Sequence, residues 1–172
     1  MKGMQLLIAD DDRALAALLE EYLFEAGYNI TLCNRGDDAI AAMQQKHFDI
    51  VLTDIVMPGA DGLTVLAATK VNNHETLVLL MTGYSGIEDA IHAVGQGAYD
   101  FISKPFQLPE LRVRLDNAAR FQSLLRRWNA LSTQSMADIA SHMFVPFQAR
   151  SATDTHHDHA AIRAYELKGK KL

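Results

Sequence analysis

The chain has few of the residues that mark cross-linked, fibrous or membrane-spanning proteins. It contains one cysteine, Cys33, in 172 residues, so no disulfide can form within the chain and no cage of thiolates can bind a metal. Four prolines and ten glycines exclude a collagen-like repeat. No apolar run approaches the roughly 20 residues of a membrane-spanning helix. With a mean hydropathy of -0.03, we expect a soluble, globular protein of the reducing cytoplasm, with no membrane contact.

Charge is distributed unevenly along the chain. Residues 1–110 hold six basic and 16 acidic side chains, whereas residues 111–172 hold ten basic and five acidic ones. An acidic body repels nucleic acid and attracts cations, while a basic tail suits an acidic protein or a phosphate backbone. The two parts are therefore expected to have different partners.

Five short apolar runs alternate with longer segments of helical periodicity. The runs lie at residues 6–9, 28–32, 50–52, 77–81 and 101–102. Three of them are apolar throughout instead of alternating, which indicates strands covered on both faces, as in a parallel sheet wrapped by helices. The sequence therefore predicts an α/β protein with a doubly wound, five-stranded parallel sheet of flavodoxin-like order 2-1-3-4-5.

Helical periodicity is clearest between the first two runs, where apolar residues fall on one helix face that ends at Gly27. These residues are Leu15, Leu18, Leu19, Tyr22, Leu23 and Ala26. Further helices are expected at residues 37–45, 62–71 and 87–94.

A longer helix is expected from Leu108, because an apolar stripe continues at near-heptad spacing. The stripe comprises Leu111, Leu115, Ala118, Leu125 and Trp128, with Phe121, Leu124 and Leu131 beside it. Its first half explains packing on the sheet, but its second half needs another surface, and a homodimer through this helix is the preferred account. We expect a domain over residues 1–121 and a helical extension with a polar tail over residues 122–172.

Acidic residues gather where two predicted strands end. The first strand ends in Asp10, Asp11 and Asp12 and the third ends in Asp54, at the edge where doubly wound sheets bind ligands. Crowded carboxylates stay ionised only beside a cation, and Mg²⁺ suits oxygen ligands. For Asp12 alone, capping of the following helix is the preferred interpretation.

Two polar residues stand at the ends of the fourth and fifth strands, at the same edge: Thr82 and Lys104. A carboxylate at position 54 would then lie between a metal and an ammonium group. This arrangement suits phosphoryl transfer, in which the cations neutralise charge on the transferred group, Thr82 donates a hydrogen bond, and Asp54 becomes an acyl phosphate.

These residues stand in segments that together resemble the receiver domain of bacterial two-component response regulators, over about residues 4–121. The last segment is most similar to receivers that precede ATPase-type transcriptional activators. The matching segments are Leu7-Ile8-Ala9-Asp10-Asp11-Asp12, Asp54-Ile55-Val56-Met57-Pro58-Gly59 with Asp61-Gly62, Met81-Thr82-Gly83-Tyr84, and Gly97-Ala98-Tyr99-Asp100-Phe101-Ile102-Ser103-Lys104-Pro105-Phe106.

The resemblance implies a phosphorelay switch instead of a metabolic enzyme. Asp54 would accept a phosphoryl group from a sensor histidine kinase or a phosphotransfer protein, and Thr82 and Lys104 would bind its oxygens. The implied ligands of Mg²⁺ are Asp10, Asp11, Asp54 and the backbone carbonyl of Val56. The Lys104–Pro105 bond is expected to be cis.

Phosphorylation of Asp54 would add charge and acceptor oxygens beside Thr82 and draw its hydroxyl inward. Phe101 could then rotate into the vacated space, although an apolar residue on a strand is also commonly plain core. The surface expected to change is formed by residues 87–94, the strand at 101–102 and the helix from Leu108. Because Val56 is apolar and Tyr84 is bulky, neither orients an attacking water, so self-dephosphorylation is expected to be slow.

Other interpretations remain open. A Mg²⁺-dependent phosphohydrolase would use Asp10 as nucleophile and Asp12 as general acid, and an inert scaffold would take no phosphoryl group.

The C-terminal part allows further alternatives. Residues 122–172 contain no GxxxxGK[ST] loop, so we expect no ATPase there. A small helix-turn-helix from Met136–Ala140 and Ala160–Leu167 is conceivable, but DNA binding is disfavoured because the segment between them is long and polar. A metal site at His156, His157 and His159 with Asp154 and Asp158 is likewise disfavoured against an exposed polar tail.

Overall fold

The computed structural model describes residues 3–83 and 87–143. The chain divides into two units, residues 1–130 and residues 131–172, and the account below concerns the first unit except where α5 continues into the second. Met136–Ala140 belongs to the continuous helix α5. The second half of the conceivable helix-turn-helix, Ala160–Leu167, and the histidine-rich segment lie outside the described residues.

Five strands form one parallel sheet in the order β2-β1-β3-β4-β5, which confirms the predicted fold. The strands are β1 (Gln5–Ala9), β2 (Asn29–Cys33), β3 (Ile50–Asp54), β4 (Leu77–Thr82) and β5 (Asp100–Ser103). The helices are α1 (Arg13–Glu25), α2 (Gly36–Gln45), α3 (Gly62–Asn72), α4 (Ile87–Gly95) and α5 (Leu108–Met143). The predicted long C-terminal helix is thus present.

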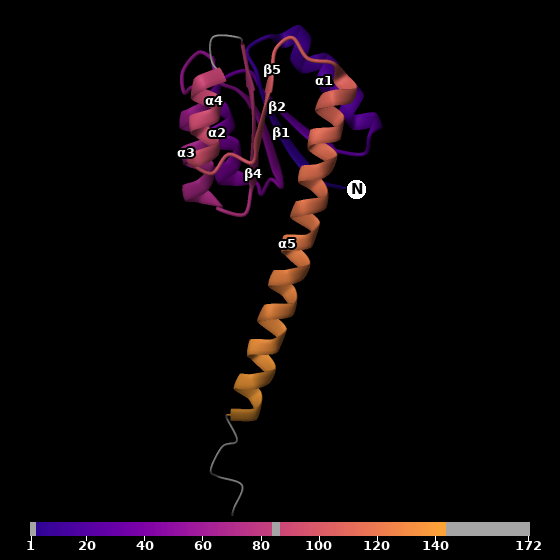
Figure 1. Ribbon diagram of the computed structural model, residues 1–172, viewed down its shortest axis with the longest axis vertical. Helices are drawn as coiled ribbons and strands as arrows, with labels where there is room; N and C mark the ends of the chain where they lie inside the picture. The colour runs from indigo at the N-terminus through magenta and orange to yellow at the C-terminus, as the bar shows by residue number, and fades with distance from the viewer. Residues whose placement is uncertain (1–2, 84–86, 144–172) are drawn as a thin grey trace, which may run out of the picture. The chain divides into compact units, whose positions relative to one another are not determined.

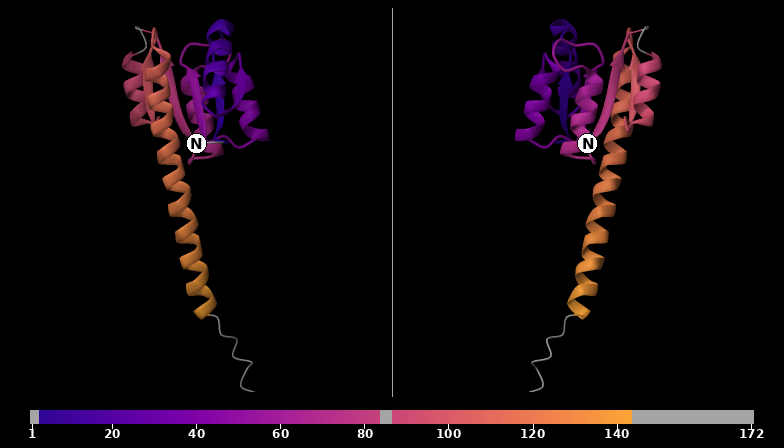
Figure 2. Two further views of the ribbon diagram at one scale, coloured as in Figure 1. Left: turned by 90° about the vertical axis from the view of Figure 1, so that its right-hand side faces the viewer. Right: turned by 90° about the vertical axis from the view of Figure 1, so that its left-hand side faces the viewer.

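Helices cover both faces of the sheet. Figure 1 shows α1 and α5 on one face and α2, α3 and α4 on the other, and the side view in the left half of Figure 2 shows α5 in front of the strands. Strands β3 and β4 are buried along their whole length, because each has a neighbour on both sides and helices on both faces. This agrees with their continuously apolar sequences.

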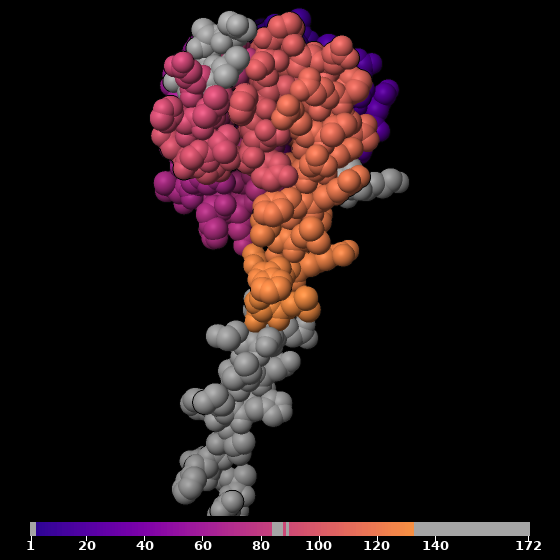
Figure 3. Space-filling view, in the orientation of Figure 1, coloured from indigo at the N-terminus to yellow at the C-terminus, as the bar shows by residue number. Residues whose placement is uncertain are grey.

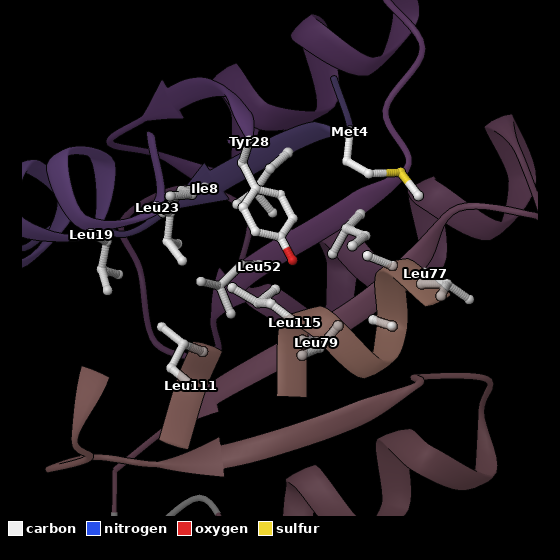
Figure 4. Close-up of a cluster of buried hydrophobic side chains, with 14 of the residues drawn as sticks. Met4, Ile8, Leu19, Leu23, Tyr28, Leu52, Leu77, Leu79, Leu111 and Leu115 are labelled. Atoms are coloured by element: carbon white, nitrogen blue, oxygen red, sulfur yellow. The ribbon is translucent and has the colours of Figure 1, made fainter. Parts of the chain in front are cut away.

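Alternate residues of each strand pack into two separate hydrophobic cores, one on each face of the sheet. Leu6 and Ile8 of β1 pack toward α1 and α5, whereas Leu7 and Ala9 pack toward α2, α3 and α4. The ring of Tyr28 lies within the first core, shown in Figure 4. Burial of each such large side chain contributes about 1.5–3 kcal/mol, so the two cores together fix the sheet that carries the polar residues at its edges.

The start of α1 confirms the capping role of Asp12. Its side chain accepts hydrogen bonds from the backbone N–H groups of Ala14 and Leu15 at 3.0 and 3.1 Å, which satisfies two donors that the helix leaves without partners. One residue of the predicted apolar face departs from expectation: Leu18 is 48% exposed. Leu19 and Leu23 instead occupy the centre of the contact with the sheet.

Two strands are longer than their apolar runs. Asp54 is the last residue of β3 and Thr82 the last of β4, which confirms the prediction that both residues stand at strand ends. Backbone pairing continues through polar residues, because a ladder bond does not depend on the side chain. Among the residues that the structure describes, no helix is both long and apolar enough to span a bilayer.

Candidate functional site

Polar side chains from three strands meet at the carboxyl edge of the sheet. Asp10 directly follows β1, Asp54 ends β3, and Lys104 directly follows β5. Parallel strands all end at this edge, so residues separated by up to 94 positions become neighbours. Asp10 is fully buried and Asp54 nearly so.

The ammonium group of Lys104 bridges the two buried carboxylates. Its Nζ lies 2.8 Å from Asp10 Oδ2 and 2.6 Å from Asp54 Oδ2. These are charge-assisted hydrogen bonds in a partly desolvated site, where they are stronger than in water. The other oxygen of each carboxylate accepts a backbone N–H, from Asp12 at 2.9 Å for Asp10 and from Val56 at 3.3 Å for Asp54.

Two members of this bridge, Asp10 and Lys104, have shifted pKa values. Burial raises the pKa of the Asp10 carboxyl above its ordinary value, even though hydrogen bonds from Lys104 and the Asp12 backbone act in the opposite direction. Burial alone would lower the pKa of Lys104, but its hydrogen bonds to Asp10 and Asp54 outweigh that effect and raise it. A single ammonium group therefore leaves the acidic cluster short of positive charge.

A third carboxylate completes an oxygen-rich cluster. One oxygen each of Asp10, Asp11 and Asp54 lies within 4.8 Å of the others. Asp11 is exposed, so the cluster is open to solvent on one side. Carboxylate oxygens with an open side are the donors that Mg²⁺ prefers, since this ion keeps several waters. These residues fit a divalent cation of this kind.

Thr82 and Phe101, the two expected switch residues, lie on one face of the sheet. Thr82 is fully buried, and its hydroxyl donates to the backbone carbonyl of Gly83 at 3.0 Å. Phe101 pairs in register with Leu80, two residues before Thr82, and its partly buried ring packs against the core under α2, α3 and α4. In this structure the hydroxyl of Thr82 is thus engaged with backbone instead of the acidic cluster.

Val56 and Tyr84 were expected to influence the lifetime of an acyl phosphate. The side chain of Val56 is 74% exposed, beside the open side of the site. Tyr84 lies outside the described residues.

The start of α3 lies so close to the backbone of Asp54 that it requires a glycine at position 62. The sequence analysis assigned no role to this residue. A Cβ at Gly62 would stand 2.2 Å from the carbonyl oxygen of Asp54, a distance that no side chain tolerates. The N–H of Gly62 donates to the carbonyl of Ile55 at 2.9 Å. Gly62 therefore lets α3 begin directly against the strand that carries Asp54, and its place after Asp61 in the quoted motif is the signal that could have found it.

Comparison with known proteins agrees with this geometry. The family model of the response regulator receiver domain matches residues 6–116. The chain belongs to this family. The Lys104–Pro105 peptide bond is cis, as the resemblance implied.

Relatives share the receiver part and little else. Transcriptional regulatory protein ZraR of Escherichia coli K12 is 36% identical over 116 residues, which is 67% of this chain and 26% of ZraR. The DNA-binding transcriptional regulator NtrC of Klebsiella pneumoniae is 35% identical over 133 residues, 77% of this chain and 28% of NtrC. The chain thus spans about a quarter of the length of these relatives, and the expected kinship to receivers of transcriptional activators is confirmed.

Solved structures give the same result. The receiver domain of NtrX from Brucella abortus matches with a TM-score of 0.63 and 32% identity, covering 66% of this chain and 96% of that chain. The phosphohydrolase interpretation is not favoured, because Asp12 caps α1 and Asp10 is ion-paired with Lys104.

Proposed function

We propose that this protein is a phosphorylation-controlled switch in a two-component phosphorelay, with Asp54 as the phosphoryl acceptor. The observation that carries the proposal is the Lys104 bridge between Asp54 and Asp10, within an oxygen cluster that fits Mg²⁺. The phosphoryl donor is a phosphohistidine on a sensor kinase or a phosphotransfer protein. The protein acts on itself in one transfer, in the cytoplasm, and processes no metabolite.

The transfer is a substitution at phosphorus. A carboxylate oxygen of Asp54 forms the new P–O bond, the P–N bond to the donor imidazole breaks, and its electron pair remains on the imidazole nitrogen. Lys104 balances charge on the phosphoryl oxygens. When bound by Asp10, Asp11, Asp54 and the Val56 carbonyl, Mg²⁺ supplies further charge neutralisation.

Acetyl phosphate with Mg²⁺ tests the assignment, because it replaces the kinase with a small phosphoryl donor. Mass spectrometry of the intact protein and its peptides should find one phosphoryl group, on Asp54. Asp54→Asn should take up none, whereas Asp12→Asn, which retains the capping oxygen, should be labelled normally. Labelling of Asp10 would support the phosphohydrolase chemistry, and no labelling of the wild-type protein would support an inert scaffold.

The signal is then read through Thr82 and Phe101. An acyl phosphate at Asp54 offers acceptor oxygens that compete with the Gly83 carbonyl for the Thr82 hydroxyl. Movement of that hydroxyl frees space on the face where Phe101 packs. The surface formed by α4, β5 and α5 changes as a result, and this is the output surface of the domain at residues 1–121.

The extension at residues 122–172 has its own proposed role as a dimerisation segment. On α5 the side chains of Phe121, Leu124, Trp128 and Leu131 are 43–70% exposed, and their 3-4-3 spacing is that of a coiled-coil seam. Figure 3 shows that no other described segment covers the surface of α5 that faces the viewer. A second copy of the same helix would cover this seam (Phe121, Leu124, Trp128 and Leu131).

Sedimentation of the full chain tests dimerisation. The wild-type protein should form dimers whose dissociation constant increases at least about tenfold on Leu124→Lys, because a charge at the seam loses its hydration. The control Arg127→Gln, an exposed change outside the seam, should leave it unchanged. A wild-type protein that remains monomeric at millimolar concentration would contradict the proposal.

A further inference from the structure

We propose that Asp49 and Arg126 form an ion-pair clamp that holds the second half of α5 against the amino-terminal edge of the sheet. The clamp lies at the opposite end of β3 from Asp54. It also determines which face of α5 is turned toward the domain and which toward a partner. Only this last consequence rests on the dimer proposed above.

The clamp is built around a buried carboxylate. Asp49 immediately precedes β3, and its side chain is only 2% exposed. One oxygen accepts the backbone N–H of Gln5 at 2.8 Å, and the other accepts the guanidinium of Arg126. The ring of His47 stands beside both, with Nε2 3.4 Å from the Asp49 oxygen and 3.3 Å from Arg126 Nη2.

Neighbouring residues extend this attachment along one face of α5. Gln122, one turn before Arg126, is buried. Asn129, about one turn after it, donates to Glu75 Oε1 at 2.6 Å. The spacing 122, 126 and 129 follows one helix face, so this face continues the apolar contact that begins at Leu111 and Leu115.

The clamp explains how α5 stays bound past its last buried apolar residues. A buried carboxylate is stable only with a partner, and loss of that partner leaves an uncompensated charge in a desolvated place. Detachment of the second half of α5 would therefore leave the buried carboxylate of Asp49 without its guanidinium partner. The ion pair thus holds the helix where apolar packing has ended.

The clamp also sets the rotation of the helix. Trp128 follows Arg126 by two residues, which is about 200° of rotation around the helix axis. Fixing Arg126 on the domain therefore turns Trp128 away from it, in agreement with an exposure of 70%. Leu124, Trp128 and Leu131 of the seam lie nearly opposite the face that holds the domain, while Phe121 at its start also contacts Tyr99, so one helix can serve both contacts at once.

Hydrogen exchange of the full-length protein tests the clamp directly. In Arg126→Gln, the backbone amides between Phe121 and Ala130 should lose at least about tenfold in protection, while the amides of β3 and β4 keep theirs. Arg127→Gln is the matched control, because it removes the same charge from the adjacent exposed position, and it should change nothing. Trp128 is the only tryptophan, so its fluorescence anisotropy should fall in Arg126→Gln alone.

A double-mutant cycle distinguishes a direct pair from general destabilisation. Asp49→Asn keeps the acceptor for Gln5, and adding it to Arg126→Gln should cause little further loss of protection. Equal behaviour of Arg126→Gln and Arg127→Gln, or fully additive effects of Asp49→Asn and Arg126→Gln, would overturn the clamp. Labelling of Asp54 by acetyl phosphate should persist in all of these variants, which confirms that they are folded and separates this test from that of the phosphorelay.

Discussion

Strand β3 has an ion pair at each end, and the two pairs differ in balance. At the carboxyl end, Asp54 shares the ammonium group of Lys104 with Asp10, and Asp11 lies close by. At the amino end, Asp49 alone pairs with the guanidinium of Arg126. Three carboxylates share one cation at the first end, whereas at the second end one carboxylate has the guanidinium of Arg126 with the ring of His47 beside it.

Under the proposed function, this difference separates a reactive site from a structural one. A surplus of negative charge, open to solvent at Asp11, can recruit a divalent cation and then accept a phosphoryl group. The pair of Asp49 and Arg126 is balanced in charge, so it recruits no further cation. Its planar guanidinium stabilises the position of α5 instead. The same strand therefore places chemistry at one edge of the sheet and mechanical attachment at the other.

The largest expected effect comes from replacing the aspartate at each end of β3, Asp54 or Asp49, with asparagine. Asp54→Asn should abolish labelling by acetyl phosphate, because the amide provides no nucleophilic carboxylate oxygen. Asp49→Asn should retain it, as judged by the mass of the intact protein. Labelling of Asp54→Asn to the wild-type level would remove the distinction between the two ends.

Removal of Lys104 should produce the next largest effect. Without the ammonium group, Asp10 and Asp54 repel each other in a buried site, so Lys104→Met should lower the free energy of unfolding by about 3 kcal/mol in the absence of Mg²⁺. Urea titrations with and without Mg²⁺ measure this. The ion should stabilise Lys104→Met more than it stabilises the wild-type protein, and equal stabilisation of both would contradict a shared charge deficit.

The lifetime of the acyl phosphate should respond more modestly to the residues that flank the site. Replacing Val56 and Tyr84 with Asn should shorten the lifetime about tenfold, because a polar side chain can orient the attacking water. Decay of the phosphorylated mass with time measures it. No acceleration would count against the expected slow self-dephosphorylation.

The smallest expected effect concerns how the affinity for Mg²⁺ depends on pH. As a proposed ligand of Mg²⁺, Asp10 must be ionised to bind the ion, and burial raises the pKa of this carboxyl above its ordinary value of 3.8. Mg²⁺ affinity should therefore weaken as the pH falls through that raised pKa, at a higher pH than for an ordinary aspartate. Calorimetric titration with Mg²⁺ across this pH range should show the decline in affinity. Asp10→Asn should bind Mg²⁺ more weakly at every pH and should lack the part of the pH dependence that Asp10 causes.

Much of the sheet and of the acidic site could be predicted because both leave local patterns. Continuous apolar runs mark β3 and β4, and aspartates at run ends mark Asp10, Asp11 and Asp54 as neighbours. The ends of β3 and β4 at Asp54 and Thr82 could be predicted in the same way, whereas β2 is shifted by one residue from its apolar run at 28–32, because ladder hydrogen bonds do not depend on the side chain. The switch roles of Thr82 and Phe101 depend on the phosphorylated state, and the role of the Val56 carbonyl depends on bound Mg²⁺, so these remain predictions.

The amino-terminal edge escaped prediction for a physical reason. Asp49 and Arg126 are 77 positions apart, and a polar residue before a strand or on a helix has no distinguishing local pattern. The sequence analysis therefore assigned the second half of α5 wholly to a partner. In the structure, Gln122, Arg126 and Asn129 face the domain, and only the opposite face remains for a second copy.

A crystal structure with Mg²⁺ and beryllofluoride, a mimic of the phosphoryl group, tests the central claim most directly. We predict the adduct on an Asp54 carboxylate oxygen, with Lys104 Nζ and the Thr82 hydroxyl bonded to its fluorines and Mg²⁺ held by Asp10 and Asp11. The Thr82 hydroxyl should have left the Gly83 carbonyl. An adduct on another aspartate, or a Thr82 hydroxyl still bonded to Gly83 beside an occupied Asp54, would contradict the account.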